Sequence, residues 1–183
     1  MAIKTFTTGE VLTASDTNTY LANAGLVFVK SQAVGGTNVA SVVVTGAFSS
    51  TYDNYFVTWQ GGSMSGDTAL KLQLGSTVTG YYGSFVYGTY TGTGPSVAGD
   101  NNSSSFTYAG GGLSIGAMSS VTLYGPNTAT RTNIVSGGIG YGLNFGSYAG
   151  TENSNTQHTA FTFIPFSGTM VNGTITVYGF RKG

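Results

Sequence analysis

Few residues in this chain could carry acid–base or nucleophilic chemistry. His158, in NTQHTAFTF, is the only histidine, and there is no cysteine. A catalytic triad needs a histidine that bonds a serine and is oriented by a carboxylate. No G-x-S-x-G turn offers such a serine. We therefore expect His158 to be a polar edge or loop residue, whose substitution leaves the main property of the protein intact.

Two carboxylates at a suitable separation would permit glycoside hydrolysis. Most acidic residues of the chain stand in turn or cap contexts, where a carboxylate bonds nearby backbone N–H groups. That interpretation accounts for them without catalysis, although a fold that brings two together would allow it. The acidic residues are Glu10, Asp16, Asp53, Asp67, Asp100 and Glu152.

Ligand-binding motifs are equally weak. The stretch GDNNS, residues 99–103, offers oxygen ligands for calcium but lacks the spaced acidic residues and terminal Glu of an EF-hand loop. One histidine without cysteine argues against zinc. The stretch GGIGYG, residues 137–142, lacks the spacing of a nucleotide-binding loop. We expect no cofactor, no metal and no enzymatic activity.

The charge of the chain limits its partners. Of 183 residues only 7% are charged, and six basic residues balance six acidic ones. Binding to nucleic acid or to an anionic membrane surface needs a basic patch, so neither is expected. A net charge near zero favours association, and we expect a homo-oligomer.

No segment has the character of a membrane span or a leader. The opening MAIKTFTTGEVLT lacks the apolar core of a signal peptide, and the apolar run 26–29 is too short to cross a bilayer. We expect neither secretion by a cleaved signal nor membrane insertion.

After Gly25 the chain repeats one pattern, in which a run of Val, Ile, Thr, Tyr and Phe precedes a turn of Gly, Ser, Asn or Asp. This pattern is typical of an all-β sandwich or barrel. In TYDNYFVTWQ, for example, Tyr55, Val57 and Trp59 share one face of a strand. We predict strands near residues 26–34, 40–45, 52–60, 69–74, 81–90, 104–109, 119–124, 131–136, 159–165 and 173–180.

Roughly eight to ten strands in residues 26–183 match an eight-stranded jelly roll with small additions. An up-and-down barrel would need more two-residue hairpins than the chain offers, and Asn172-Gly173 is the clearest such signal. We therefore predict a jelly-roll-like antiparallel β-sandwich. Long polar loops are expected at residues 61–67, 92–105 and 146–157.

Residues 1–25 differ from the rest and are predicted to form an arm with a short helix. Thr13 suits the N-cap, Asp16 is a capping-box-like partner and Gly25 suits the position after the helix. A helix of about 11 residues is marginal in water without a partner surface. It must dock on its own sandwich, a sister subunit or another protein, and the sequence leaves these alternatives open.

The arm also carries a family resemblance. The opening KTFTTGEVLTASDTNTYLANAG resembles the start of small virion proteins of tailed bacteriophages, common in marine and actinobacterial phages. The residues that match their pattern are Phe6, Thr7, Gly9, Leu12, Thr13, Ala14, Ser15, Asp16, Asn18, Thr19, Tyr20 and Leu21. The body resembles the Gly/Ser-rich β domains that follow in those proteins. The resemblance implies a place in the virion, as a minor tail, fibre-like or structural protein, and supplies no catalytic residues.

Together these features predict a non-enzymatic virion protein, made in the host cytoplasm, tail- or fibre-associated and displayed for host attachment. A trimer is the arrangement that viral jelly rolls often adopt. The alternatives are a capsid decoration protein (cement or head fibre) and a carbohydrate-binding or carbohydrate-active protein. We expect the arm to attach to other virion proteins through Phe6, Leu12, Tyr20 and Leu21.

Any contact with a host glycan or protein would fall on the polar loops. Tyrosine beside Ser, Gly and Asn is a composition typical of binding surfaces, although aromatic residues in strands pack by default in the core. The expected contact residues are Asp100, Asn101, Asn102, Ser103, Tyr148, Glu152, Asn153 and Asn155.

Overall fold

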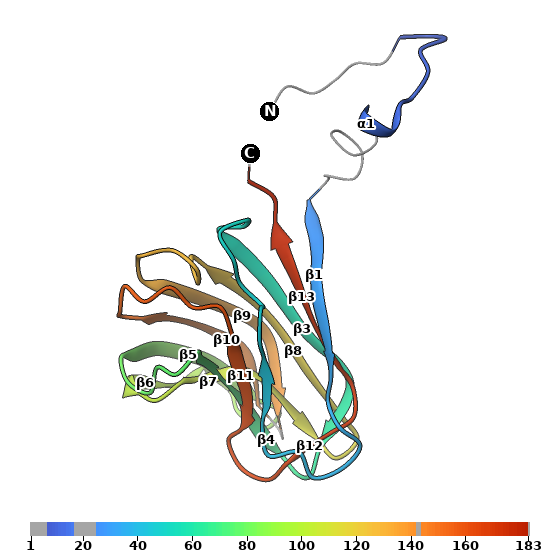
Figure 1. The fold of residues 1–183 in the computed structure, drawn as a ribbon. Coiled ribbons are helices and arrows are strands. Elements are labelled where there is room, and N and C mark those ends of the chain that lie inside the picture. Colours follow the sequence, from blue (N-terminus) through green and yellow to red (C-terminus); the bar gives the residue numbers. More distant parts are fainter. Residues whose placement is uncertain (1–6, 17–24, 142–143, 183) are drawn as a thin grey trace.

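A computed structural model of the chain describes residues 7–16, 25–141 and 144–182 (Figure 1). Antiparallel strands make up nearly all of its regular structure, as the sequence pattern predicts. The strands are β1 Leu26–Ala33, β2 Val42–Val44, β3 Asn54–Met64, β4 Thr68–Leu74, β5 Tyr81–Thr89, β6 Ser96–Ser103, β7 Phe106–Leu113, β8 Gly116–Tyr124, β9 Thr132–Tyr141, β10 Asn144–Glu152, β11 Phe161–Pro165, β12 Met170–Val171 and β13 Thr174–Phe180.

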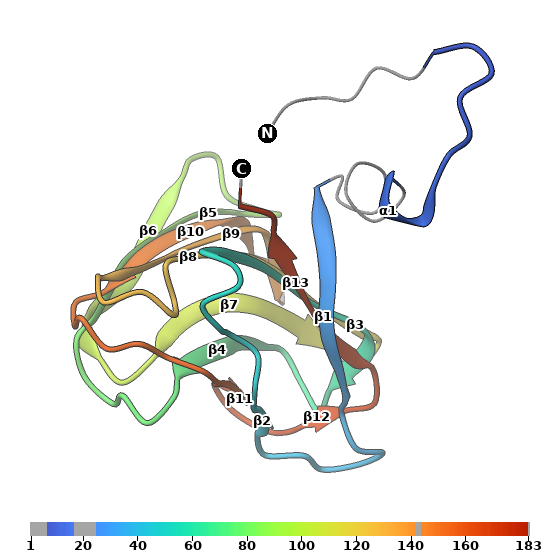
Figure 2. The ribbon, with the colours of Figure 1, turned by 45° about the horizontal axis from the view of Figure 1, so that its top comes forward.

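The strands form two layers of a sandwich (Figure 2). The larger layer has the order β1-β13-β3-β8-β9-β10-β5-β6, and the smaller has the order β2-β11-β4-β7. The layers are joined by the β7–β8 hairpin, in which Gly111 pairs with Met118 and Leu113 with Gly116. β12 extends the larger layer by pairing with the end of β3.

The core lies between the layers and is built by alternation along the strands. Tyr55, Val57 and Trp59 of β3 are fully buried, so the face predicted for this strand is confirmed, and Ile175 and Val177 of β13 are fully buried beside them. The smaller layer contributes Val44, Leu70, Leu72, Leu74, Phe106, Phe161 and Phe163. The Phe48 ring packs edge-on against Tyr55 and stacks on Phe161, which links the layers.

Pairing in the two layers is nested along the chain. The first strand, β1, pairs with the last, β13. Moving inward along the chain, β2 pairs with β11, β3 with β8 and β4 with β7. The hairpins β5–β6 and β9–β10 are additions, which pair with each other and extend the larger layer beyond β8.

All ten predicted strands are present, but three more were missed. The expected loop at 92–105 contains β6, and the expected loop at 146–157 contains most of β10, so both loop predictions were wrong over those residues. β3 also continues into the expected loop at 61–67, and β12 was not foreseen. In β6 and β10, residues that usually mark turns lie inside strands because β5 pairs with both.

The turn before the last strand has the predicted character. Asn172 and Gly173 have φ values of 55° and 86°, the left-handed backbone expected of an Asn-Gly turn. The Trp59 indole donates a hydrogen bond of 3.3 Å to the Asn172 carbonyl oxygen. A Cβ at residue 173 would lie 2.6 Å from that indole nitrogen, so glycine is needed there for packing as well as for backbone conformation.

Candidate functional site

The described part of the arm lies away from the sandwich (Figure 1) and buries none of its residues. The Thr13 hydroxyl accepts a bond of 3.1 Å from the Asp16 N–H, while the Asp16 carboxylate accepts one of 3.1 Å from the Thr13 N–H. This is the predicted capping box, and it starts the helical turn α1, Ala14–Asp16. Gly25 has a φ of 88°, which suits the predicted position after the helix.

Of the expected anchoring residues, the structure describes one. Leu12 is 48% exposed, and the neighbouring Val11 is 79% exposed. Phe6, Tyr20 and Leu21 lie outside the described residues, as does the rest of the predicted helix. The described arm therefore presents apolar side chains to solvent, and its role in attachment stays a prediction.

We expected Asp100 in a loop that faces solvent. It is instead a buried residue of β6. Its carboxylate accepts a hydrogen bond of 2.6 Å from the Tyr148 hydroxyl, and others from the N–H (2.9 Å) and hydroxyl of Thr107. Burial, with the bond to Asp100, raises the pKa of Tyr148 above its ordinary range. The Asp100 carboxylate therefore links β10 and β6 of the larger layer to β7 of the smaller layer, and the solvent-facing loop positions expected of Asp100 and Tyr148 were wrong.

Glu152 is also buried, and with His158 it forms a second internal pair. The His158 Nε2 and Glu152 Oε2 atoms are 3.3 Å apart, with side chains 2% and 1% exposed. The Glu152 carboxylate also accepts bonds of 2.9 Å from the N–H and the hydroxyl of Ser154. The solvent-facing loop position expected of Glu152 was wrong, because Glu152 ends β10 and is buried. His158 does lie in a loop, as predicted, between β10 and β11, but its side chain is buried. Together these residues fix the start of the segment that joins β10 to β11.

Two of the remaining expected contact residues, Asn102 and Asn153, meet at Gly80. The Gly80 N–H donates a bond of 3.0 Å to the Asn102 Oδ1, and the Gly80 carbonyl accepts one of 2.9 Å from the Asn153 N–H. Thus the end of β6 and the segment after β10 lie side by side, although they are far apart in the sequence. Ser103 is half-buried beside them. We call the exposed residues Asn101, Asn102, Asn153 and Asn155 the asparagine patch.

The asparagine patch suits an uncharged polar ligand. Amide side chains provide both donors and acceptors, and exposed Val78 and Thr79 from the β4–β5 connection flank Gly80. The buried pair of Glu152 and His158 holds the segment beneath the patch. The sequence pointed to this region through its Asn and Ser content but not to the inward orientation of Asp100, Tyr148 and Glu152.

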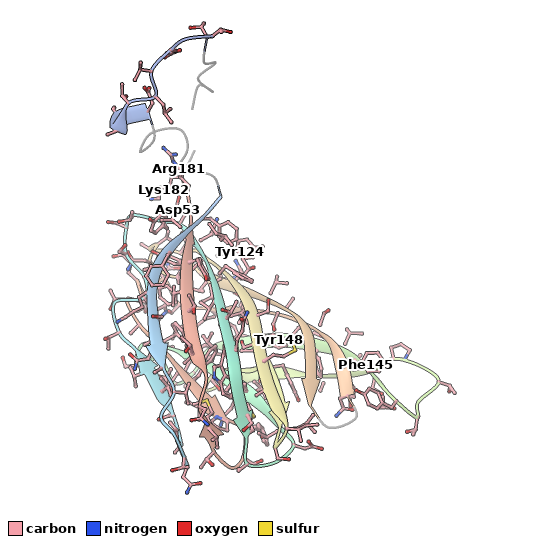
Figure 3. All side chains as sticks on the ribbon, turned by 90° about the vertical axis from the view of Figure 1, so that its right-hand side faces the viewer. Asp53, Tyr124, Phe145, Tyr148, Arg181 and Lys182 are labelled. Atoms are coloured by element: carbon pink, nitrogen blue, oxygen red, sulfur yellow. The ribbon has the colours of Figure 1, made fainter. Side chains whose placement is uncertain are left out.

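The other carboxylates have structural partners or stand apart. Asp53 forms an exposed ion pair of 2.8 Å with Lys182 at the end of the sandwich (Figure 3), and Glu10 accepts a bond of 3.1 Å from the Thr7 N–H. Asp67 lines a surface pocket of about 170 Å³ together with Thr68, Ala69, Tyr108, Phe166 and Ser167. In the described ranges, no cluster of three His, Asp or Glu residues could hold a metal ion.

No family model matches this chain, and neither does any curated protein. The resemblance of the arm to phage virion proteins therefore stays a prediction. Within the residues that the structure describes, no helix has the length and apolar character to span a bilayer.

A further surface was not predicted from the sequence. The outer face of the larger layer carries exposed aromatic and β-branched side chains, among them Phe28, Val86, Tyr124, Val135 and Phe145. Figure 3 labels Tyr124 and Phe145 on this face. The alternation that identified the inner face also places these residues outward. The outward-facing positions of this alternation were the feature of the sequence that could have identified this surface.

Proposed function

We propose that this protein is a non-enzymatic structural component of a bacteriophage virion, attached to other virion proteins by its N-terminal arm. We place it at the tail or its fibres, where the sandwich is displayed for host attachment. In this proposal the asparagine patch is the host-facing surface, and its ligand is an uncharged glycan or a protein surface. The chain works as a homo-oligomer.

The placement of the arm and the patch carries the proposal. The described arm residues are unburied and lie at the upper right of Figures 1 and 2, whereas the loops after β10 and before β5 lie at the left. Attachment through the arm would therefore leave the patch directed away from the attachment point. A protein that carries host-binding groups on a particle needs this arrangement.

The strand order supports a jelly roll as the architecture of the displayed domain. The orders β1-β13-β3-β8 and β2-β11-β4-β7 have the nested pairing of two Greek keys, with β5–β6 and β9–β10 as inserted hairpins. We propose that the sandwich is a jelly roll whose larger sheet has been widened by these hairpins. An experimental structure with a different strand order would contradict this.

Deletion of residues 1–25 tests the attachment. Phage particles assembled with the truncated chain should lack it, while purified 26–183 keeps the circular dichroism spectrum of the sandwich. Normal incorporation of the truncated chain would show that attachment does not need the arm. Cryo-electron microscopy of the particle gives the location, and copies on the capsid lattice would make the protein a capsid decoration protein instead.

The host contact needs a separate test. The double substitution Asn101→Ala/Asn153→Ala removes amides from the asparagine patch. The control is Asn38→Gly, which removes an exposed amide from the segment between β1 and β2, where the φ of 52° suits glycine. We expect the double variant, but not the control, to slow adsorption of phage to host cells. Equal adsorption rates would remove the patch from the proposal. Release of sugar from host polysaccharide by the purified protein would contradict a non-enzymatic role.

A further inference from the structure

The outer face of the larger layer is unusual in having no charge in the described residues. The charged residues of its eight strands are Lys30, Asp100 and Glu152. The two carboxylates are buried on the inner side. Lys30 lies at a bulge in β1, and its ammonium group donates a bond of 2.7 Å to the Thr45 carbonyl, just after β2 of the smaller layer. The outer face therefore offers only apolar, hydroxyl, amide and backbone groups.

This face is continuous across the layer because the strands are in register. One row of directly paired outward residues runs from edge to edge. It consists of Phe28, Tyr178, Phe56, Thr122, Val135, Ala149, Ser84 and Gly99. The aromatic end is a packed group, with ring centroids 6.3 Å apart for Phe28 and Tyr178 and 6.5 Å for Phe56 and Tyr178.

The apolar side chains of the face remain accessible in the single chain. Phe28 is 60% exposed, Val86 50%, Val135 47% and Phe145 50%. Soluble monomers seldom expose extended apolar patches, and such patches usually mark an interaction surface. We therefore expect a partner molecule to cover this face.

The size of the face suits one partner of the same kind. Eight strands about 4.8 Å apart and about seven residues long at about 3.3 Å each cover about 900 Å². Each partner of a standard protein interface buries about 800 Å².

The absence of charged side chains on the described outer face favours a second copy of this chain as that partner. A charged partner surface would have to bury its charges without counterions on this face, which is costly. A second copy brings no charge to the contact, and with zero formal net charge the two chains do not repel each other as a whole. Self-complementary contact of one surface with itself gives a two-fold pair.

We propose that two copies of this chain associate through the outer faces of their larger layers, with the row from Phe28 to Gly99 at the centre of the contact. This inference rests on the self-association in the proposed function and names its surface. It is independent of whether the arm binds a virion.

Light scattering on the purified full chain tests the proposal. The wild type should have twice the 18.7 kDa chain mass, and Val135→Lys should reduce it to the single-chain mass. Val43→Lys is the matched control, because Val43 is 54% exposed on the smaller layer and its substitution should leave the pair intact. A wild-type chain that is monomeric at every micromolar concentration would overturn the proposal. So would a pair that Val43→Lys dissociates and Val135→Lys does not.

A second measurement does not depend on dissociating the pair. The chain has no cysteine, so Val135→Cys or Val43→Cys each allows a single spin label. Double electron–electron resonance should give a short distance between copies for the label at 135 and a longer one, or none, for the label at 43. The reverse order would show self-association through another surface, and the attachment test with residues 1–25 would be unaffected.

Discussion

The Tyr148 hydroxyl donates a hydrogen bond of 2.6 Å to the Asp100 carboxylate across 48 residues of sequence. Tyr148 lies in β10, whereas Asp100 lies in β6, with β5 between them. Because Asp100 also accepts from Thr107 of β7, this carboxylate ties the added hairpins to the smaller layer. Removing Asp100 would take the acceptor from both Tyr148 and Thr107, whereas removing the Tyr148 hydroxyl would leave Asp100 with only its bonds from Thr107.

Tyr148→Phe removes the hydroxyl and little else. We expect the free energy of unfolding to fall by about 1.5–3 kcal/mol, the range for hydrogen bonds to charged groups. Tyr124→Phe is the control, because Tyr124 is 43% exposed, and surface substitutions usually change stability by less than about 0.5 kcal/mol. Urea denaturation followed by circular dichroism measures both. If Tyr148→Phe unfolds at the same urea concentration as the wild type, the hydrogen bond adds no stability.

Alkaline pH should destabilise the fold through Tyr81 and Tyr148. Burial raises the pKa of both phenols above the ordinary value of 10.0. Below pH 10 both states keep these protons, so stability is unaffected. Above it the unfolded chain loses them and the folded chain does not, so stability falls, by up to about 1.4 kcal/mol per pH unit for each phenol.

The alkaline effect is measured by urea denaturation at pH values from 8 to 11. The slope above pH 10 should be smaller in Tyr148→Phe than in the wild type, because that variant has one fewer shifted phenol. An identical slope in the two proteins would mean that Tyr148 ionises equally in the folded and unfolded states.

Gly83 should not tolerate alanine, because the Tyr148 ring lies over it. A Cβ at residue 83 would overlap the Tyr148 hydroxyl oxygen, whereas a Cβ at Gly137 would have no atom within 4 Å. Overpacking of this kind costs about 1–3 kcal/mol, so Gly83→Ala should lower the thermal midpoint. Gly137→Ala, also in a strand, should leave it unchanged or slightly higher. Equal effects of the two substitutions would contradict the packing.

His158→Ala should destabilise the protein even if it leaves its main property intact. It removes the His158 ring that lies 3.3 Å from the Glu152 carboxylate, and the loss of a hydrogen bond costs about 0.5–1.5 kcal/mol. His158→Gln retains a donor and should cost less. If the two variants unfold at the same denaturant concentration, the pair makes no specific contribution.

The core strands could be predicted because their chemistry differs between the two faces. Val57 and Trp59 alternate with the polar residues Thr58 and Gln60, and the period of two identifies a strand with one buried face. Burial then follows from the pattern, and the structure agrees at both apolar positions.

β6 and β10 could not be predicted from the same rule. Their sequences SVAGDNNS and NFGSYAGTE hold residues that usually mark turns. Glycine is needed at residue 150 of β10 because the Tyr148 side chain and the Tyr82 carbonyl oxygen of β5 lie over it, and at residue 99 of β6 because a Cβ there would meet the Gly83 carbonyl oxygen of β5. These requirements depend on contacts with the neighbouring strand, and the inward placement of Asp100 depends on Tyr148 and Thr107. No local pattern contains this information.

The antiparallel pairing of β1 with β13 also has a mechanical consequence. The ladder begins at Leu26 and Phe180, at the end of the sandwich where the arm joins. Its hydrogen bonds lie perpendicular to the strands, so tension applied through the arm along β1 shears many of them at once. Tension between the two chain termini instead peels the ladder open pair by pair. A tether through the arm alone thus loads the molecule in its more resistant direction.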